Sequence, residues 1–171
     1  PSIVFGPEDQ FFNRFAALAR VSPVLPLVGG GRTKFQPVFS GDVGEAVANA
    51  VTGSGKAGEV YELGGPQVVT FREILESTLQ YSGRQKMLLS VPFWMMKLQA
   101  LLTWPLPNAI RPVTVDQLRL LKLDNVVSDA AKREDRTIAA LGVPQPASIE
   151  AIVPQYLERF NPKGQYASYR V

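Results

Sequence analysis

A glycine-rich stretch, GSGKAG at residues 53–58, is the segment of this sequence that most directly suggests chemistry. Gly53, Gly55 and Gly58 match the G-x-G-x-x-G pattern letter for letter, and Lys56 adds a cation within it. In nucleotide-binding proteins this pattern follows a strand and opens a helix, so that the helix N-terminus faces the pyrophosphate. Here the order is reversed, because a helical pattern precedes the stretch and a strand pattern follows it. We therefore predict a flexible connection and no nucleotide-binding loop.

The side chains that most often carry acid–base, nucleophilic or metal chemistry are missing. The 171 residues include no cysteine and no histidine, which excludes disulfides, thiolate metal sites and the commonest general base. We predict no metal site in this chain. The formal net charge is +3, from 18 Lys and Arg against 15 Asp and Glu, and the basic residues form no single run. We therefore predict no nucleic-acid partner.

The elements that would position a site fall into two zones. In residues 1–66, short apolar runs alternate with helical patterns, which indicates βα units and a parallel sheet. Three glycines at 29–31 permit an unusual backbone path. Asp42 is expected to cap a helix, and Pro37 indicates an edge or a break in a strand. We expect strands at 2–5, 34–40 and 59–63, and helices at 8–19 and 42–52.

The second zone, residues 67–171, has mostly helical patterns. Thr70 and Glu73 form a capping box for a helix that ends near Gly83. The segment KMLLSVP at 86–92 is predicted as a short, fully buried strand. Residues 122–128 are expected to form a loop between two helices, in which Asn125 or Ser128 caps the second helix. Further helices are expected at about 92–103, 115–123, 134–141 (ending at Gly142) and 148–160.

The most apolar stretch runs from Val91 to Leu106, is interrupted by Lys97 and is bounded by prolines. It is shorter than the roughly 20 apolar residues that a membrane-spanning helix needs. We interpret it as a core helix. Trp94 and Trp104, together with two methionines, leave open a helix that lies on a membrane surface.

Three segments of the chain carry a family resemblance: PSIVFGP at 1–7, GGGRTKFQPVFSGDVGEAV at 29–47 and YELGGPQVVTFREI at 61–74. In this order they resemble the second half of extended or atypical short-chain dehydrogenases/reductases, the group of the nucleotide-sugar epimerases and dehydratases. The similarity is greatest to the branch with the accessory NAD(P)H-binding subunit of respiratory complex I and its bacterial relatives. It implies an α/β fold: the C-terminal part of a Rossmann-type parallel sheet in residues 1–66, plus a small, mostly helical C-terminal lobe in 67–171.

The resemblance also implies parts that this chain does not carry. Family members begin with a Gly-rich strand–turn–helix that holds the pyrophosphate, and many have a Tyr-x-x-x-Lys pair. No tyrosine of this chain is followed by lysine four residues later, since those positions hold Gly65, Gln85, Phe160 and Arg170. We therefore expect a C-terminal fragment that has no catalytic residue of its own and is inactive alone. Its full-length parent would bind NADP or NAD, and the fragment would not hold the cofactor tightly.

By the same resemblance, the first strand runs beneath the nicotinamide. Pro1, Ser2 and Ile3 would then approach the carboxamide through their backbone groups. The alternative is that these residues are simply a buried parallel strand.

The resemblance further implies a substrate cleft at Gly6, Phe12, Phe35 and Gln36. Sugar-nucleotide enzymes often carry Asn where this chain has Ile3 and Arg where it has Phe35. An apolar side chain cannot replace either group, because a bound diphosphate needs charge-assisted donors. Sugar-nucleotide chemistry is therefore disfavoured.

Two functions of different classes are considered, and a third, a quinone-biosynthesis or electron-transfer accessory factor, is left open because no residue tests it. The first is a structural or assembly module of a complex I-like enzyme whose cofactor is structural. The second is an active oxidoreductase, epimerase or dehydratase whose Tyr and Lys lie in the missing N-terminal half. The expected partners are that missing half, complex I subunits or a membrane surface, and a second copy of the fragment. The expected location is the cytoplasm, at the inner face of a bacterial inner membrane.

Overall fold

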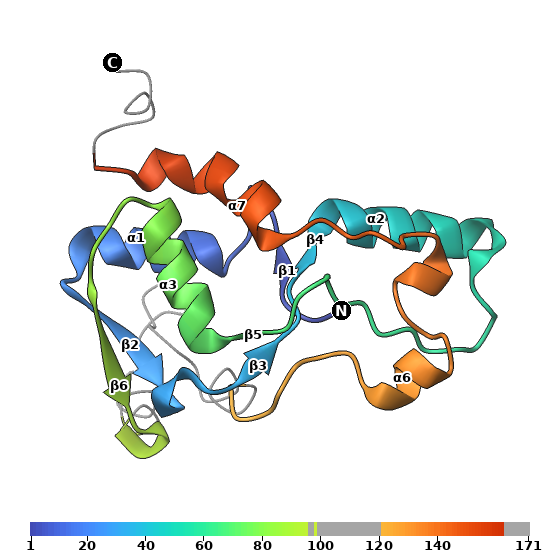
Figure 1. Cartoon of the computed structure of the whole chain (residues 1–171), viewed down its shortest axis with the longest axis horizontal. Coiled ribbons are helices and arrows are strands. Elements are labelled where there is room, and N and C mark those ends of the chain that lie inside the picture. Colours follow the sequence, from blue (N-terminus) through green and yellow to red (C-terminus); the bar gives the residue numbers. More distant parts are fainter. Residues whose placement is uncertain (96–97, 99–120, 163–171) are drawn as a thin grey trace.

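The computed structural model describes residues 1–95, 98 and 121–162. Most of the expected helices at 92–103 and 115–123 therefore lie outside the described residues, as do Trp104 and residues 163–171. In Figure 1, strands β2 and β6 lie at one end of the molecule, and helices α2 and α6 lie at the other. The described helices are α1 (Phe12–Val21), α2 (Ser40–Asn49), α3 (Phe71–Tyr81), α6 (Asp129–Arg133) and α7 (Ile149–Leu157).

The described strands form three two-stranded sheets, of which two are parallel. The mixed α/β class with parallel strand pairs is thereby confirmed. Parallel pairs need long crossover connections, and here the crossovers contain helices. The pairs are β1 (Val4–Phe5) with β4 (Val38–Phe39), β2 (Val24–Val28) with β6 (Met87–Val91), and, antiparallel, β3 (Lys34–Phe35) with β5 (Val69–Thr70).

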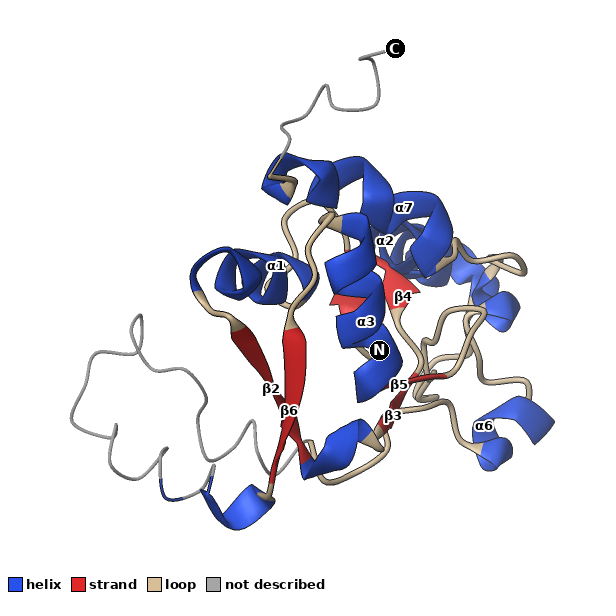
Figure 2. Cartoon of the chain, turned by 60° about the vertical axis from the view of Figure 1, so that its left-hand side comes forward, coloured by secondary structure: helices blue, strands red, loops and turns tan. Residues whose placement is uncertain are grey.

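Helices α1 and α3 cover one face of the β2–β6 pair (Figure 2). Ala19 of α1, Leu25 of β2 and Leu79 of α3 pack together. After β2 the chain turns through Gly29–Gly31, whose φ angles are 60°, 73° and 70°. Only glycine adopts three such angles in succession at little cost, so the unusual path expected at these residues is confirmed.

Aromatic rings form the centre of the core where α1, α3 and α7 meet β1 and β3. The centroids of neighbouring rings lie 5.2–6.5 Å apart, mostly edge to face, as aromatic pairs prefer. This core joins residues from both predicted zones, and the boundary at residue 66 stays a prediction. Its rings and aliphatic side chains include Phe5, Phe11, Phe12, Phe15, Phe35, Phe71, Ile74, Leu75, Ile149, Val153 and Leu157.

Several helix ends lie where the sequence indicates them. Thr70 accepts a hydrogen bond from the Glu73 N–H, and the Glu73 carboxylate accepts one from the Thr70 N–H, so the capping box is confirmed. Ser128 caps α6 and Ser148 caps α7. Gly142, with φ of 83°, ends a short 3-10 turn at Ala139–Leu141.

Other element predictions are wrong in identifiable ways. The 34–40 segment is not one strand but is divided at Pro37, where the sequence indicates a break, into β3 and β4. Residues 59–63 form no strand but a single bridge from Glu62 to Thr137. Asp42 is not the cap of α2 but lies in its first turn, where its carboxylate accepts from the Ala147 N–H at 2.7 Å. Instead of one helix at 134–141, the structure has α6 and the 3-10 turn. Strand β6 is not fully buried, since Met87 is 68% exposed.

Candidate functional site

The carboxyl end of β1 opens into a cavity of about 430 Å³. In open α/β sheets, ligands bind at the carboxyl ends of parallel strands, so this edge is where a site is expected. We call this space the loop cavity, because the turn that leaves β1 forms most of its wall. It is lined by Val4, Phe5, Gly6, Pro7, Glu8, Asp9 and Ser40.

Asp9 ties this loop to two helices. Its carboxylate accepts hydrogen bonds from the N–H groups of Phe11 at 2.8 Å and Asn13 at 3.1 Å, at the start of α1. It also accepts from the Gly6 N–H at 3.4 Å and from the Tyr156 hydroxyl of α7 at 2.5 Å. One carboxylate therefore holds the β1 turn, the N-terminus of α1 and α7 together.

Tyr156 is the tyrosine that the structure places beside this cavity, and its side chain is 8% exposed. Burial raises the pKa of Tyr156 well above its ordinary value, and the hydrogen bond to Asp9 raises the pKa further. A tyrosine that transfers protons at neutral pH needs a pKa that is lowered instead. The geometry therefore indicates that Tyr156 positions the Asp9 carboxylate, to which its hydroxyl donates a hydrogen bond.

Ser2 and Ile3 are held by a second network at the amino-terminal ends of β1 and β4. The Ser2 hydroxyl donates to the Asn125 carbonyl at 2.6 Å and accepts from the Gln36 N–H at 3.1 Å. The Ser2 N–H donates to the Leu63 carbonyl at 2.9 Å, and the Ile3 carbonyl accepts from the Val38 N–H at 2.9 Å.

Gln36 is the centre of that network and lines a second cavity, of about 440 Å³, which we call the Gln36 cavity. Its amide N–H donates to the Gly65 carbonyl at 2.8 Å, and its amide oxygen accepts from the Val127 N–H at 3.0 Å. Gly65 lies so close to the backbone that a Cβ there would stand 1.9 Å from the Pro37 carbonyl oxygen. The glycines of the YELGGP segment thus allow the 59–65 backbone to meet residues 36–37.

The predicted site residues do not come together in one cleft. Gly6 lines the loop cavity and Gln36 lines the Gln36 cavity. Phe12 and Phe35 are 0% and 5% exposed within the aromatic core, and neither is among the residues that line these two cavities. The assignment of these residues, and of Pro1, Ser2 and Ile3, to a substrate or cofactor site stays a prediction.

Sequence reasoning missed Asp9 and Tyr156. Asp9 had a readable signal, since an Asp just before a helical pattern is a preferred partner for the first free N–H groups of the helix. The contact with Tyr156 joins residues 147 positions apart, and no local pattern predicts it.

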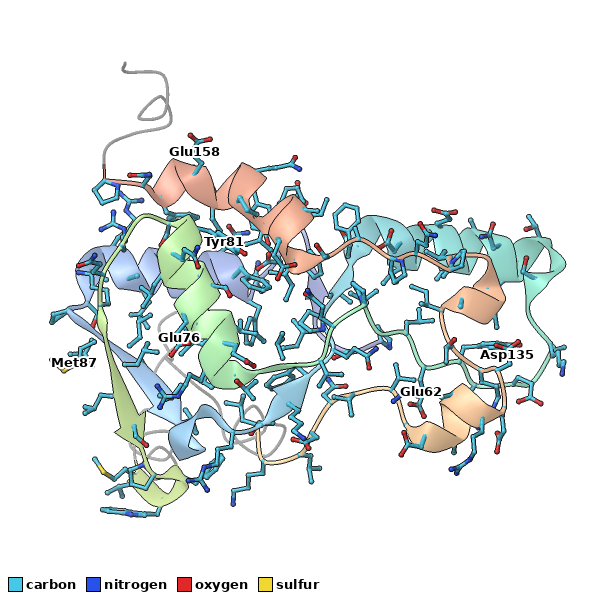
Figure 3. The ribbon with its side chains drawn as sticks, in the orientation of Figure 1. Glu62, Glu76, Tyr81, Met87, Asp135 and Glu158 are labelled. Atoms are coloured by element: carbon cyan, nitrogen blue, oxygen red, sulfur yellow. The ribbon has the colours of Figure 1, made fainter. Side chains whose placement is uncertain are left out.

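A further polar cluster joins the 59–62 segment to α6 (Figure 3). The Glu62 carboxylate accepts from the N–H of Ser128 at 2.6 Å and from its hydroxyl at 2.9 Å, and these hydrogen bonds lower the pKa of Glu62. The Arg136 guanidinium pairs with Glu134 at 2.5 Å and donates to the Val60 carbonyl at 2.6 Å. The cluster replaces strand pairing as the anchor of residues 59–62.

The GSGKAG stretch follows the C-terminal end of α2, through a turn at Ala50–Ser54, and no helix begins directly after it. The prediction that this stretch is a connection that follows a helix is confirmed, and the prediction that it binds no phosphate stays a prediction. No group of three or more potential metal ligands occurs in the described part of the chain.

Comparison with known proteins identifies relatives of the whole chain. No protein-family model matches it. The mitochondrial NADH dehydrogenase [ubiquinone] 1 alpha subcomplex subunit 9 of Arabidopsis thaliana is 34% identical over 140 residues, which are 77% of this chain and 35% of that protein. The mitochondrial NADH-ubiquinone oxidoreductase 40 kDa subunit of Neurospora crassa is 29% identical over 171 residues, which are 97% of this chain and 42% of that protein. The chain thus spans 35–42% of the length of these relatives.

Solved structures show the same fold. The dTDP-glucose 4,6-dehydratase of Streptomyces venezuelae, with NAD and TYD bound, aligns with a TM-score of 0.60 at 19% identity, over 99% of this chain and 42% of that one. The UDP-glucose 4-epimerase of Thermus thermophilus, in complex with NAD, aligns with a TM-score of 0.59 at 18% identity, over 93% of this chain and 44% of that one. At these identities the likeness concerns the fold alone. The resemblance to extended short-chain dehydrogenases/reductases, and to complex I subunits among them, is confirmed.

Proposed function

We propose that this chain is part of a longer NAD(P)H-binding protein, the parent, that serves as a structural or assembly subunit of a complex I-like NADH dehydrogenase. The observation that carries the proposal is the 34% identity over 140 residues to a subunit of mitochondrial NADH dehydrogenase. In this proposal the dinucleotide is a resident part of the structure and is not consumed. The parent would lie at the respiratory membrane, on the cytoplasmic face if the organism is a bacterium.

The environment of Tyr156 supports a structural role. Its phenol is buried, donates to Asp9 and has a raised pKa, so it does not replace the proton-transferring tyrosine of active family members. Ile3 and Phe35 add to this, because neither side chain can donate a hydrogen bond to a substrate diphosphate. In the proposed role, these side chains would stabilise the fold and would not relay protons to a substrate.

The residues that would meet the cofactor are Pro1, Ser2 and Ile3. Bound NADP or NAD would supply a hydride-carrying nicotinamide ring at the first strand. Because the Ser2 N–H and the Ile3 carbonyl are already bonded to Leu63 and Val38, these residues would orient the ring from a rigid strand. The chain alone, which spans 35–42% of its relatives, would hold the dinucleotide weakly.

The test is thermal unfolding of the parent with NADPH, together with a turnover assay. A ligand at 100 times its Kd that binds only the folded state adds about 2.7 kcal/mol of stability, so the melting temperature should rise. The absorbance of NADPH at its reduced-nicotinamide band should stay constant during incubation with small carbonyl and sugar-nucleotide substrates. Steady oxidation of NADPH would favour an active oxidoreductase with its Tyr and Lys outside this chain. Conversion of a sugar nucleotide without net oxidation of NADPH, followed by product analysis, would favour an epimerase or dehydratase.

A further inference from the structure

Helix α7 and the short turn after it are bonded at two points to the turn that leaves β1. The Tyr156 hydroxyl donates to the Asp9 carboxylate, and the Arg159 guanidinium donates to the Pro7 carbonyl at 3.4 Å. The Arg159 guanidinium also donates to the side-chain carbonyl of Asn13, at the start of α1, at 2.6 Å. Tyr156 and Arg159 are three positions apart and so lie on one side of the helix end. We call these two residues the clasp.

The clasp acts on the wall of the loop cavity, because its acceptor residues Pro7 and Asp9 line that cavity and the clasp residues do not. Within the turn, the Asp9 N–H donates to the Gly6 carbonyl at 3.0 Å, and the Gly6 N–H donates to the Asp9 carboxylate at 3.4 Å. Pro7 and Glu8 between them are exposed. Hydrogen bonds, and little apolar burial, therefore fix the conformation of this turn.

Helix α7 is anchored independently of the turn. Its side chains Ile149, Val153 and Leu157 lie in the aromatic core and are at most 5% exposed. Just before the helix, the Ala147 N–H donates to the Asp42 carboxylate of α2, and α7 lies beside α1 (Figure 1). Since α7 is buried in the core and the turn is largely exposed, the clasp transmits the position of α7 to the cavity wall.

The side chains that line the loop cavity offer acceptors and no cation. Glu8 brings a carboxylate and Ser40 brings a hydroxyl, whereas the Asp9 carboxylate is already engaged by four donors. None of the seven lining residues is Lys or Arg, so the lining offers no basic side chain to a phosphate. The lining fits a ligand group that donates hydrogen bonds, as the carboxamide of a nicotinamide does.

We propose that the clasp positions the wall of the loop cavity for the nicotinamide end of a dinucleotide, so that occupancy of the cavity and docking of α7 stabilise each other. Tyr156 and Arg159 are positioning residues, which act on the ligand only through Pro7 and Asp9. Coupling of this kind is reciprocal in free energy, so the ligand strengthens the clasp by the factor by which the clasp strengthens ligand binding. This inference rests on the proposed function, because its ligand is the dinucleotide of the parent.

The alternative is a clasp that only stabilises the fold. Its loss would then lower the free energy of unfolding and leave the ligand affinity of the folded protein unchanged. A positioning role instead lowers the fraction of folded molecules whose turn is held, and the apparent Kd rises as the inverse of that fraction. The two roles therefore differ in ligand affinity and in the local amide exchange of the turn.

The first arm of the test is amide hydrogen exchange of the ligand-free parent. Tyr156→Phe combined with Arg159→Gln should increase the exchange of the Gly6 and Asp9 amides at least about tenfold, because loss of a charge-assisted hydrogen bond shifts a local opening equilibrium by about that factor. Exchange in β2 and β6 should stay as in the wild type. Equal exchange of the turn amides in both proteins would overturn the proposal.

The second arm compares the Kd values of NADPH and NADH with those of the matching ADP-ribose molecules, which lack the nicotinamide. The double variant should raise the Kd of the dinucleotide about tenfold and leave the Kd of ADP-ribose unchanged. In the wild type, the dinucleotide should slow amide exchange in α7 by the same factor, and ADP-ribose should not. Arg159→Lys, which keeps a cationic donor, should recover part of the affinity that Arg159→Gln loses.

Matched controls change similar side chains away from the clasp. Gln155→Ala alters an exposed side chain of α7 whose amide donates to the Ala151 carbonyl of the same helix, and Arg133→Gln removes one positive charge at the end of α6. Both should match the wild type in both arms, and circular dichroism should show that the variants are folded. If the double variant does not fold, Tyr156→Phe alone, which keeps the ring, provides the same comparison.

The outcomes separate this inference from the proposed function. A wild type that binds a dinucleotide no better than the folded double variant would overturn the positioning role and leave the proposed function standing. Equal losses of affinity for the dinucleotide and for ADP-ribose would do the same. A wild-type parent that binds neither dinucleotide would overturn the proposed function, and the coupling with it.

Discussion

Replacing Tyr156 by phenylalanine tests the structural role of the loop cavity's tyrosine. The change removes only the hydroxyl that donates to the Asp9 carboxylate at 2.5 Å. Asp9 keeps its bonds from the N–H groups of Phe11 and Asn13, so α1 remains capped. What is lost is the link between the turn after β1 and α7.

The expected cost is about 1.5–3 kcal/mol of unfolding free energy, because the lost hydrogen bond is to a charged acceptor. The part of the alkaline pH dependence of the unfolding free energy that Tyr156 causes should disappear with the hydroxyl. Since the folded state raises the pKa of Tyr156 above its ordinary value, the contribution to stability is complete below about pH 10 and declines as the pH rises further. Tyr156→Phe should therefore lose less stability than the wild type between pH 9 and pH 11.

Urea unfolding at pH 7, pH 9 and pH 11 measures both effects. Tyr61→Phe is the matched control, because the Tyr61 hydroxyl only accepts from the Lys56 N–H at 3.0 Å in an exposed connection. This control should change stability by less than about 0.5 kcal/mol. If Tyr156→Phe is equally neutral at pH 7, or keeps the wild-type alkaline loss, the phenol does not hold Asp9 and the reasoning fails.

Three other predictions concern the fold. Gly65→Ala should destabilise the protein by at least about 1–3 kcal/mol in urea unfolding, because its Cβ would stand 1.9 Å from a carbonyl oxygen; Gly44→Ala, in α2 with nothing within 4 Å, should instead stabilise it by about 0.5–1 kcal/mol. Thr70→Ala should cost about 1 kcal/mol and increase amide exchange in the first turn of α3, since it removes the capping box; unchanged exchange there would contradict this. Ser128→Ala should raise the pKa of Glu62, measured by NMR titration, because it removes the hydroxyl donor, which is the smaller of the two hydrogen-bond causes that lower this pKa, and keeps the Ser128 N–H. In the wild type the Glu62 carboxylate, whose pKa is lowered by folding, stabilises the fold at pH values above the ordinary pKa of glutamate, and this stabilisation is lost on acidification. A Glu62 pKa that is the same in Ser128→Ala and in the wild type would refute the assignment.

Local signals predicted those parts of the fold that local physics decides. The capping box at Thr70, the cap at Ser128, the turn at Gly142 and the break at Pro37 each depend on one residue and its immediate neighbours. The strand expected at 59–63 is absent, although the apolar pattern of this segment fits a strand. In the structure the segment is held by the Glu62 carboxylate, which accepts two hydrogen bonds from Ser128, and a local pattern does not reveal such a contact.

The candidate site was less predictable, because its contacts join distant parts of the chain. Ser2 meets Asn125 across 123 positions, and Tyr156 meets Asp9 across 147. The motif resemblance located the β1 turn and Gln36 but not the separate cavities that Gly6 and Gln36 line. Exposure of Met87 was also missed, since a run such as MLLSV is typical of a strand that is buried on both faces.

Native mass spectrometry of the parent, purified without added cofactor, tests the central claim most directly. We predict a mass excess equal to one NADP or NAD per chain, which is released on denaturation and is unchanged after incubation with candidate substrates. A protein of apo mass that gains no mass with NADPH or NADH would contradict the account.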